Sequence, residues 1–294
     1  MLTQENFGLV IDEMMRGAID MHVHFGPDMP PAPDIRVARR LDGLGIARQA
    51  REAGMRAIVM KSHHWPTGAL ARTIQPIIPE VALFGTVVLN YSIGGLNPFA
   101  VEVAAKIGCK VVFPPTWNSA YHLSRHVPES LIPVGVRGRP GLTVLDESGR
   151  LLPEMHEILD IIKANDMVIA TGHLSPREHL VLVAEAHQHG IQRIVVSHVR
   201  EEITLEERKR MADQGAVIEL IYRPKMDPEA IIRSAQAIGV ERCAMTVDGG
   251  QAFNPYAAEA FRAFVGQLLY HGMNPEEVKT IAQRVPARVL GLNS

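Results

Sequence analysis

The chain has 294 residues, of which 47% are hydrophobic and 21% are charged. This composition is typical of a globular protein with a large core and excludes a disordered or fibrous chain. Thirty Lys and Arg residues against 32 Asp and Glu residues leave a net charge of −2 at pH 7. No positive field is available to hold a phosphate backbone, so we expect no nucleic-acid partner.

The two cysteines and the amino-terminal segment indicate the compartment. Cys109 and Cys243 lie in apolar, strand-like runs, which suits reduced core thiols better than a disulfide framework. Charged side chains interrupt residues 1–17, and no stretch reaches the roughly 18 apolar residues that a membrane helix needs. We therefore expect a cytoplasmic protein without a membrane partner.

Short apolar, β-branched runs alternate with amphipathic segments along the whole chain. Eight runs typical of buried parallel strands begin near Ala18, Arg56, Ala82, Cys109, Met167, Arg193, Ala216 and Cys243. Helices are predicted between them, most with a glycine just after the last helical residue. These predicted helices include residues 45–53, 98–107, 176–189, 205–214 and 228–238.

Eight strand and helix units predict a closed (β/α)₈ TIM barrel of the α/β class. An open doubly wound sheet usually has fewer strands and carries a glycine-rich phosphate loop, which this sequence lacks. We expect one domain over residues 1–294. The long gap between Cys109 and Met167 predicts an insertion at about residues 118–152, with a small hairpin over 142–152 that walls the pocket above strand 4.

Histidines and one aspartate end several of the predicted strands. His22 and His24 end strand 1, and the period of two sends both imidazoles to one face. His173 ends strand 5, His198 ends strand 6 and Asp248 ends strand 8. Reactive groups of this fold lie at the carboxyl ends of the strands, so these five side chains should converge.

This convergence predicts a metal site in the barrel mouth. A single strand-end histidine is more often a hydrogen-bonded structural residue, but histidines at the ends of several strands favour a shared ion. Four imidazoles and a carboxylate suit Zn²⁺ first, while Mn²⁺, Fe²⁺, Co²⁺ and Ni²⁺ remain possible.

The ordered set of residues resembles the amidohydrolase superfamily of metal-dependent hydrolases. The match comprises the His-x-His of strand 1, a histidine after each of strands 5 and 6, an aspartate after strand 8, and the terminal segment Pro286-Ala287-Arg288-Val289-Leu290-Gly291-Leu292. The resemblance extends over the whole chain, and its motifs follow the strands in the order that the family has. The resemblance implies a metal-dependent hydrolase that cleaves an amide, lactone or ester bond of a small molecule with metal-activated water.

The resemblance also implies a role for each strand-end residue. His22, His24 and His173 would be metal ligands. His198 would bind a second metal ion or polarise the substrate. Asp248 would be both a ligand and the group that takes a proton from water and passes it to the leaving group.

The chain departs from the family pattern at strand 4. Many two-metal members place a bridging lysine or glutamate there, but this run ends in the apolar segment 111–117. We favour a single ion. The alternative is that Lys61 or His63 of strand 2 replaces the bridge, and a further reading has Lys61 binding a substrate carboxylate while His63 or His64 shapes the pocket.

Several loop residues are candidates for binding the substrate. Arg223 suits a carboxylate or phosphate, which a guanidinium clamps with two hydrogen bonds, and Trp117, Asn118 and Tyr222 also follow strands. Decarboxylation or phosphoester hydrolysis on the same site, or an inactive barrel that only binds, are the alternatives. A homo-oligomer is possible through the apolar helix at 261–269.

The remaining histidines fall on the insertion or on predicted helices. We expect them to be solvated or structural. They are His122, His126, His156, His179, His187, His189 and His271.

Overall fold

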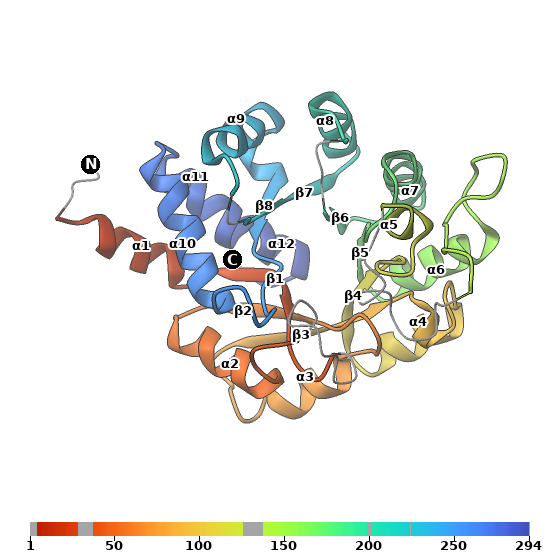
Figure 1. Ribbon diagram of the computed structural model, residues 1–294, viewed down its shortest axis with the longest axis horizontal. Coiled ribbons are helices and arrows are strands. Elements are labelled where there is room, and N and C mark those ends of the chain that lie inside the picture. The colour runs from red at the N-terminus through yellow and green to blue at the C-terminus, as the bar shows by residue number, and fades with distance from the viewer. Residues whose placement is uncertain (1–4, 29–37, 126–137, 199–201, 224, 294) are drawn as a thin grey trace.

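The computed structural model describes residues 5–28, 38–125, 138–198, 202–223 and 225–293. Eight parallel strands form one sheet in which each strand pairs with the next along the chain. They are β1 (Ile19–His24), β2 (Ala57–Lys61), β3 (Ala82–Val88), β4 (Cys109–Phe113), β5 (Val168–Ala170), β6 (Ile194–Val196), β7 (Ala216–Ile221) and β8 (Cys243–Thr246). Helices surround this sheet (Figure 1). The predicted (β/α)₈ barrel and the predicted strand starts are confirmed.

The helices lie outside the strands, as the amphipathic pattern predicts. They are α1 (Phe7–Met15), α2 (Gly43–Glu52), α3 (Gly68–Ile74), α4 (Pro98–Lys106), α5 (Ala120–Leu123), α6 (Pro153–Ala164), α7 (Pro176–Gln188), α8 (Leu205–Asp213), α9 (Pro228–Ile238), α10 (Ala257–Tyr270), α11 (Pro275–Lys279) and α12 (Val285–Leu290). Short helical segments η1 (Tyr91–Ile93), η3 (Val240–Arg242) and η4 (Thr280–Arg284) complete the set. Within the described ranges, none of the helices has the length and apolar character needed to cross a bilayer.

The carboxy-terminal helix α12 closes the amino-terminal end of the barrel. Val285, Ala287 and Val289 belong to the apolar cluster inside the sheet. Arg193, directly before β6, donates to the Val289 carbonyl at 2.9 Å, which places α12 beside the beginnings of the strands. The opposite end is left open for the strand-end histidines.

Strand β1 contains an irregularity that decides which way its histidines point. Met21 packs into the cluster inside the barrel, whereas Val23 packs into the outer cluster beneath the helices. The pairing with β2 shifts register between Asp20 and Val23. Such a bulge re-aims side chains, and it brings His22 to the same inner face as Met21.

The seam between the last and first strands is lightly paired. In the described part of the chain, the backbones of the β8 and β1 segments share a single bridge, between Val23 and Gly249, and the Thr246 hydroxyl of β8 donates to Asp20 Oδ1 of β1 at 2.5 Å. The His24 amide donates to the Gly249 carbonyl at 2.8 Å. A Cβ at Gly250 would lie 2.0 Å from the His24 carbonyl oxygen, so only glycine permits this close approach.

The insertion between β4 and β5 contains the predicted turn. Leu145 and Leu151 form an antiparallel bridge, and the Asp146 amide donates to the Arg150 carbonyl at 2.8 Å. The Tyr91 hydroxyl, after β3, donates to the Pro140 carbonyl at 2.5 Å. Residues 126–137 of the insertion, with His126, lie outside the described residues.

Candidate metal centre

Two of the strand-end residues have an uncommon backbone conformation. His198 has φ 53° and Asp248 has φ 48°, in the left-handed region that few residues other than glycine adopt. Strain of this kind persists where the surrounding structure holds it, and it concentrates at functional sites. Both residues lie two positions after the end of their strands, β6 at Val196 and β8 at Thr246, where the chain turns at the rim of the barrel.

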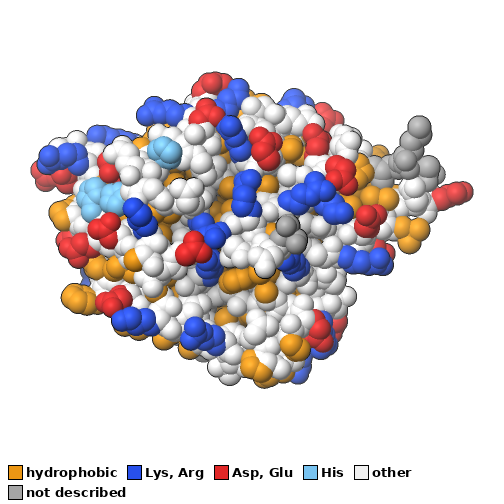
Figure 2. Space-filling view, turned by 180° about the vertical axis from the view of Figure 1, so that it is seen from behind, with side chains coloured by type: hydrophobic (Ala, Val, Ile, Leu, Met, Phe, Trp, Pro, Cys, Tyr) orange, Lys and Arg blue, Asp and Glu red, His pale blue; other side chains and the backbone are white. Residues whose placement is uncertain are grey.

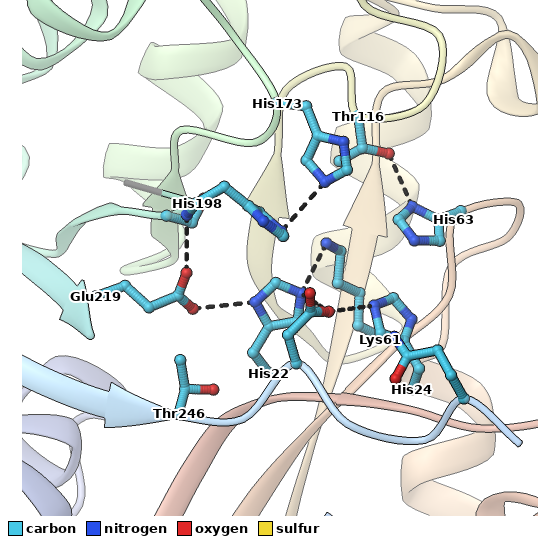
Figure 3. A network of polar contacts seen from close by, with 12 residues as sticks. His22, His24, Lys61, His63, Thr116, His173, His198, Glu219 and Thr246 are labelled. Atoms are coloured by element: carbon cyan, nitrogen blue, oxygen red, sulfur yellow. Dashed lines mark hydrogen bonds and ion pairs between the residues drawn. The ribbon is translucent and has the colours of Figure 1, made fainter. Parts of the chain in front are cut away.

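His22, His24 and Asp248 meet at one point. The Nε2 atoms of His22 and His24 each lie 3.2 Å from Asp248 Oδ1 (Figure 3). His22 Nδ1 lies 3.0 Å from Glu219 Oε1, and because a carboxylate only accepts, Nδ1 carries the hydrogen. When the ring is neutral, His22 Nε2 carries a lone pair that faces the carboxylate oxygen of Asp248. A cation between these two acceptor atoms would stabilise the arrangement.

The distances fit the donor set of a divalent ion. Ligand atoms about 2.0–2.2 Å from a tetrahedral Zn²⁺ lie roughly 3.3 Å from one another, close to the separations between Asp248 and the two imidazoles of β1. The ligand atoms of His22, His198 and Asp248 also lie within 4.8 Å of one another. The residues present therefore fit a metal ion.

His173 and His198 complete the group. Their Nε2 atoms are 3.1 Å apart, and His173 Nδ1 lies 3.1 Å from His122 Nδ1. The His22 and His198 rings meet edge to face with centroids 5.0 Å apart. The structure therefore brings all five strand-end residues together, and it adds His122 of α5, which we expected to be solvated or structural.

Burial favours the uncharged form of three imidazoles in this group. It lowers the pKa of His24 to about 3 and moves the pKa of His173 and that of His198 well below the usual range. Burial acts in the opposite direction on Asp248, but the neighbouring His22 imidazole and the other histidines hold the pKa of its carboxyl well below the usual value. Neutral imidazoles and an ionised carboxylate are the forms that bind metal ions.

Lys61 reaches the same group from β2. Its fully buried Nζ lies 2.9 Å from His22 Nε2 and 4.3 Å from the centroid of the Phe113 ring. Burial lowers the pKa of Lys61 to about 8. The ammonium donates to the nitrogen that would bind an ion, so Lys61 and a metal ion compete for one lone pair.

The chain matches one described protein family over most of its length. Residues 17–219 match a family described as "Family of unknown function (DUF6282)". The chain belongs to this DUF6282 family. A comparison with curated proteins finds no match.

Solved structures show the same barrel as this DUF6282 protein. The probable dipeptidase PvdM from Pseudomonas aeruginosa has a TM-score of 0.68 at 11% identity, over 98% of each chain. A zinc-bound amidohydrolase from Burkholderia multivorans has a TM-score of 0.60 at 12% identity, over 94% of this chain and 99% of that one. 5-Carboxyvanillate decarboxylase LigW from Sphingomonas paucimobilis has a TM-score of 0.56 at 13% identity, over 95% and 100%.

These likenesses confirm the fold that the resemblance implies. The barrel of this DUF6282 protein has the same fold as the amidohydrolase and the probable dipeptidase. At identities of 11–13% the likeness shows the fold alone.

Glu219 and Asp28 are buried carboxylates that our sequence reasoning missed. Glu219 Oε2 accepts from the His198 amide at 2.9 Å, while its Oε1 faces His22. Glu219 lies within the apolar strand β7, and a charged residue in such a run is the signal that marks it. Asp28 lies in the described residues after β1, where the sequence carries no comparable signal.

Asp28 supports the His24 side of the group. Its carboxylate accepts from Arg39 at 2.5 Å, from Ser62 Oγ at 2.5 Å and from the His63 amide at 2.9 Å. Burial alone would raise the pKa of Asp28, but the Arg39 guanidinium holds it below the usual value. His24 Nδ1 lies 3.7 Å from Asp28 Oδ2, beyond hydrogen-bond distance, and this buried nitrogen has no hydrogen-bond partner.

His63 and Trp117 form a stacked wall beside the metal candidates. The His63 ring stacks on His24 at 4.7 Å and on Trp117 at 4.4 Å between centroids. His63 Nδ1 pairs with Thr116 Oγ1 at 2.8 Å. Burial holds the pKa of His63 well below its usual value, so this wall is uncharged.

The other predicted substrate residues lie in different environments. Arg223 is half-exposed, and its Nη1 donates to Asp248 Oδ2 at 3.3 Å. The Tyr222 ring packs 5.7 Å from the Phe264 ring of α10.

Asn118 is buried, and its Oδ1 accepts from the amide of Tyr91 at 2.8 Å. This contact ties the loops after β3 and β4 together. Asn118 therefore shapes the wall of the mouth.

A cavity of about 640 Å³ opens beside the centre. It runs from His198 and Glu219 to the space between α8 and α9, where Arg208, Ile231 and Ser234 line it. A volume of this size is typical of sites for small molecules.

Proposed function

We propose that this DUF6282 protein is a metal-dependent hydrolase that cleaves an amide, lactone or ester bond of a small anionic molecule. The observation that carries the proposal is the meeting of the Nε2 atoms of His22 and His24 on Asp248 Oδ1, with His173 and His198 beside them. The cavity next to His198 supplies room for the substrate.

The donor set supports one divalent ion, with Zn²⁺ as the first candidate. His22, His24 and Asp248 would hold it together with His173 or His198. When bound, such an ion supplies a Lewis acid that makes water nucleophilic at neutral pH. Lys61 contacts His22 and bridges no second group of ligands, which supports a single-ion site. The ligand atoms of His24, Asp28 and His63 lie within 4.8 Å of one another, so a second ion held there is the alternative.

Asp248 performs the proton transfer in this proposal. Its Oδ1 faces the ligand nitrogens, and Arg223 holds its Oδ2, so the carboxylate is oriented toward the axis of the barrel. The low pKa of Asp248 keeps its carboxylate ionised, the form that can accept a proton. A bound ion would acidify water enough for this transfer, and Asp248 would pass the proton to the leaving group. His198, on the cavity side, polarises the bond that is cleaved.

The exposed guanidinium of Arg223 supports an anionic substrate. The cavity is lined by both signs of charge, Arg125, Arg208, Arg223 and Lys225 with Glu202, Glu219 and Asp227; Arg125 pairs with Glu202, whereas Arg223 has half of its side chain exposed. A guanidinium in that position can bind a carboxylate or phosphate with two hydrogen bonds. The small-molecule partner is therefore expected to carry a negative group near the bond that is cleaved.

Decarboxylation is the second candidate. Arg223 lies directly beside Asp248, where it would hold a carboxylate that is itself the reacting group. A hydrolase forms a new carboxylate or phosphate without releasing CO₂, whereas a decarboxylase releases CO₂ and consumes a carboxylate.

The test is a measurement of metal content followed by a substrate screen. We expect about one equivalent of a divalent transition metal in the purified protein and its loss in His22→Ala. N-acyl compounds, lactones and phosphoesters with anionic groups are then screened, with CO₂ release measured in parallel on aromatic acids. Asp248→Asn should lower kcat by about 10²–10⁴-fold.

His187→Ala, at an exposed position of α7, is the matched control and should leave metal content and activity unchanged. A protein with well under one equivalent of metal, unaffected by His22→Ala, would contradict the proposed function.

A further inference from the structure

Four potential metal-binding side chains gather on the outside of the barrel, where α6 meets the end of α7. His156 and Asp160 lie one turn apart on α6, and Glu185 and His189 lie one turn apart at the end of α7. Residues four apart share one face of a helix. Figure 2, which is seen from behind, shows histidine side chains gathered toward the left edge of the molecule. This edge corresponds to the right side of Figure 1, where α6 and α7 lie.

The ligand atoms of this group are close together. One ligand atom each of His156, Glu185 and His189 lies within 4.8 Å of the other two. Asp160 Oδ1 lies 3.9 Å from His189 Nε2 and offers a fourth donor. All three members of the first set are half-buried, so the group is accessible to ions from solvent.

The tautomer of His189 favours metal binding. Its Nδ1 lies 2.9 Å from the backbone carbonyl of Glu185. A carbonyl oxygen only accepts, so Nδ1 carries the hydrogen and the neutral ring has its lone pair on Nε2, the atom near Asp160. A backbone carbonyl that orients a histidine in this way is typical of metal ligands.

The two imidazoles also suit a shared cation. The rings of His156 and His189 stack with centroids 5.3 Å apart and an interplanar angle of 26°. Two protonated rings at this distance repel each other, whereas neutral rings offer two nitrogen donors. The carboxylates of Glu185 and Asp160 supply the negative charge that a divalent ion needs.

We propose that His156, Glu185 and His189, with Asp160 as the fourth donor, form a Zn²⁺ site that fastens α6 to α7. Two imidazoles and two carboxylates are ordinary ligands of four-coordinate zinc. From separations of at most 4.8 Å, the ligand atoms of His156, Glu185 and His189 close to about 3.3 Å through side-chain rotation at half-buried positions. This site shares no residue with the centre in the barrel mouth.

The test measures zinc stoichiometry on the full-length protein. Equilibrium dialysis against Zn²⁺ should show two equivalents in the wild type. The double variant His156→Ala/His189→Ala should lose one equivalent, and His187→Ala, an exposed histidine of α7 outside the group, should retain both. His22→Ala should lose only the equivalent in the barrel mouth, so failure of one site is distinguishable from failure of the other.

Thermal unfolding supplies a second readout. Zn²⁺ added to His22→Ala should raise its Tm through the site between α6 and α7, and Glu185→Gln in that background should abolish most of this shift. Glu185→Gln keeps the size of the side chain, so it reports on binding if the double variant fails to fold. Equal zinc stoichiometry in the wild type and in the variants of His156, Glu185 and His189 would overturn the proposal.

Discussion

Glu219 positions two histidines of the candidate centre from one buried strand. One of its oxygens faces His22 Nδ1 and the other accepts from the His198 amide. Glu219→Gln keeps the volume but places an NH₂ group against one of these two donors. We expect a 10–100-fold loss of metal affinity, measured by competition with a zinc chelator.

Glu178→Gln is the matched control for this substitution. Glu178 is also a buried glutamate, but it caps α7 and binds Thr143 and Ser175 instead of the centre. We expect Glu178→Gln to lower the stability of the fold and leave metal affinity unchanged. Equal metal affinity in Glu219→Gln and the wild type would contradict the positioning role.

The buried imidazole of His179 should make the free energy of unfolding depend on pH. Burial lowers the pKa of this imidazole from 6.5 to about 4 in the folded protein, and its Nδ1 has no hydrogen-bond partner. As pH falls below 6.5, the unfolded chain binds a proton that the folded chain does not, so this contribution to stability is lost between pH 6.5 and about 4. The loss amounts to about 3 kcal/mol.

Urea unfolding at pH 7 and at pH 4.5 checks this expectation. His179→Leu should reduce the difference between the two pH values, because it removes one titrating group and its unpaired nitrogen. The part of the difference that comes from His24, His63, His173 and His198, whose pKa values burial also lowers, should remain. His187→Ala, which removes an exposed histidine from the same helix, should leave the pH dependence as in the wild type. A difference between the two pH values as large in His179→Leu as in the wild type would show that His179 makes no contribution to it.

At the scale of elements, α3 approaches β3 so closely that backbone meets backbone. A Cβ at Gly85 of β3 would lie 2.4 Å from the Cα of Gly68, the first residue of α3. The neighbouring backbone cannot yield as a flexible side chain can. We expect Gly85→Ala to lower the free energy of unfolding by about 1–3 kcal/mol, measured by urea denaturation.

Gly8→Ala is the control for this prediction. Gly8 is exposed on α1, and a Cβ there meets no atom within 4 Å. Its effect should stay within about 0.5 kcal/mol. A loss in Gly85→Ala no larger than that would show that α3 shifts outward at little cost.

The length and hydrophobic pattern of each helix and strand explain which parts of the fold could be predicted from the sequence. Strands such as β4 and β8 are short apolar runs, and glycines such as Gly108 and Gly190 mark helix ends by their positive φ. Helix α3 has seven residues and begins with glycine, so its pattern is too short for a helical period to emerge. The bulge in β1 is likewise invisible in the sequence, because alternation alone does not place Met21 and His22 on one face.

At the scale of the whole molecule, the candidate metal centre spans the weakest seam of the sheet. Among the described residues, β8 and β1 share one bridge, yet Asp248 after β8 contacts His22 and His24 of β1. An ion bound there would join the two ends of the sheet. At a free ion concentration 100-fold above its Kd, binding adds about 2.7 kcal/mol of stability.

Chelation tests this linkage. Removal of the metal should lower Tm by roughly 5–10 °C and speed amide hydrogen exchange in β1 and β8 more than in β3 and β4. Restored zinc should reverse both changes in the wild type but not in His22→Ala. Uniformly faster exchange across all strands would show that the ion does not act at the seam.

The sequence by itself determined the order of strands and the residues that end them. Apolar runs, glycines after helices and the positions of His22, His24, His173, His198 and Asp248 are local signals, and in a parallel barrel all strand ends meet at one rim. The tertiary structure alone decided the partners of these residues: Glu219 beneath His22, Lys61 against the same imidazole, and His122 beside His173. Such pairs depend on register, on a bulge and on side-chain reach between distant segments, and none of these is a property of a short stretch of chain.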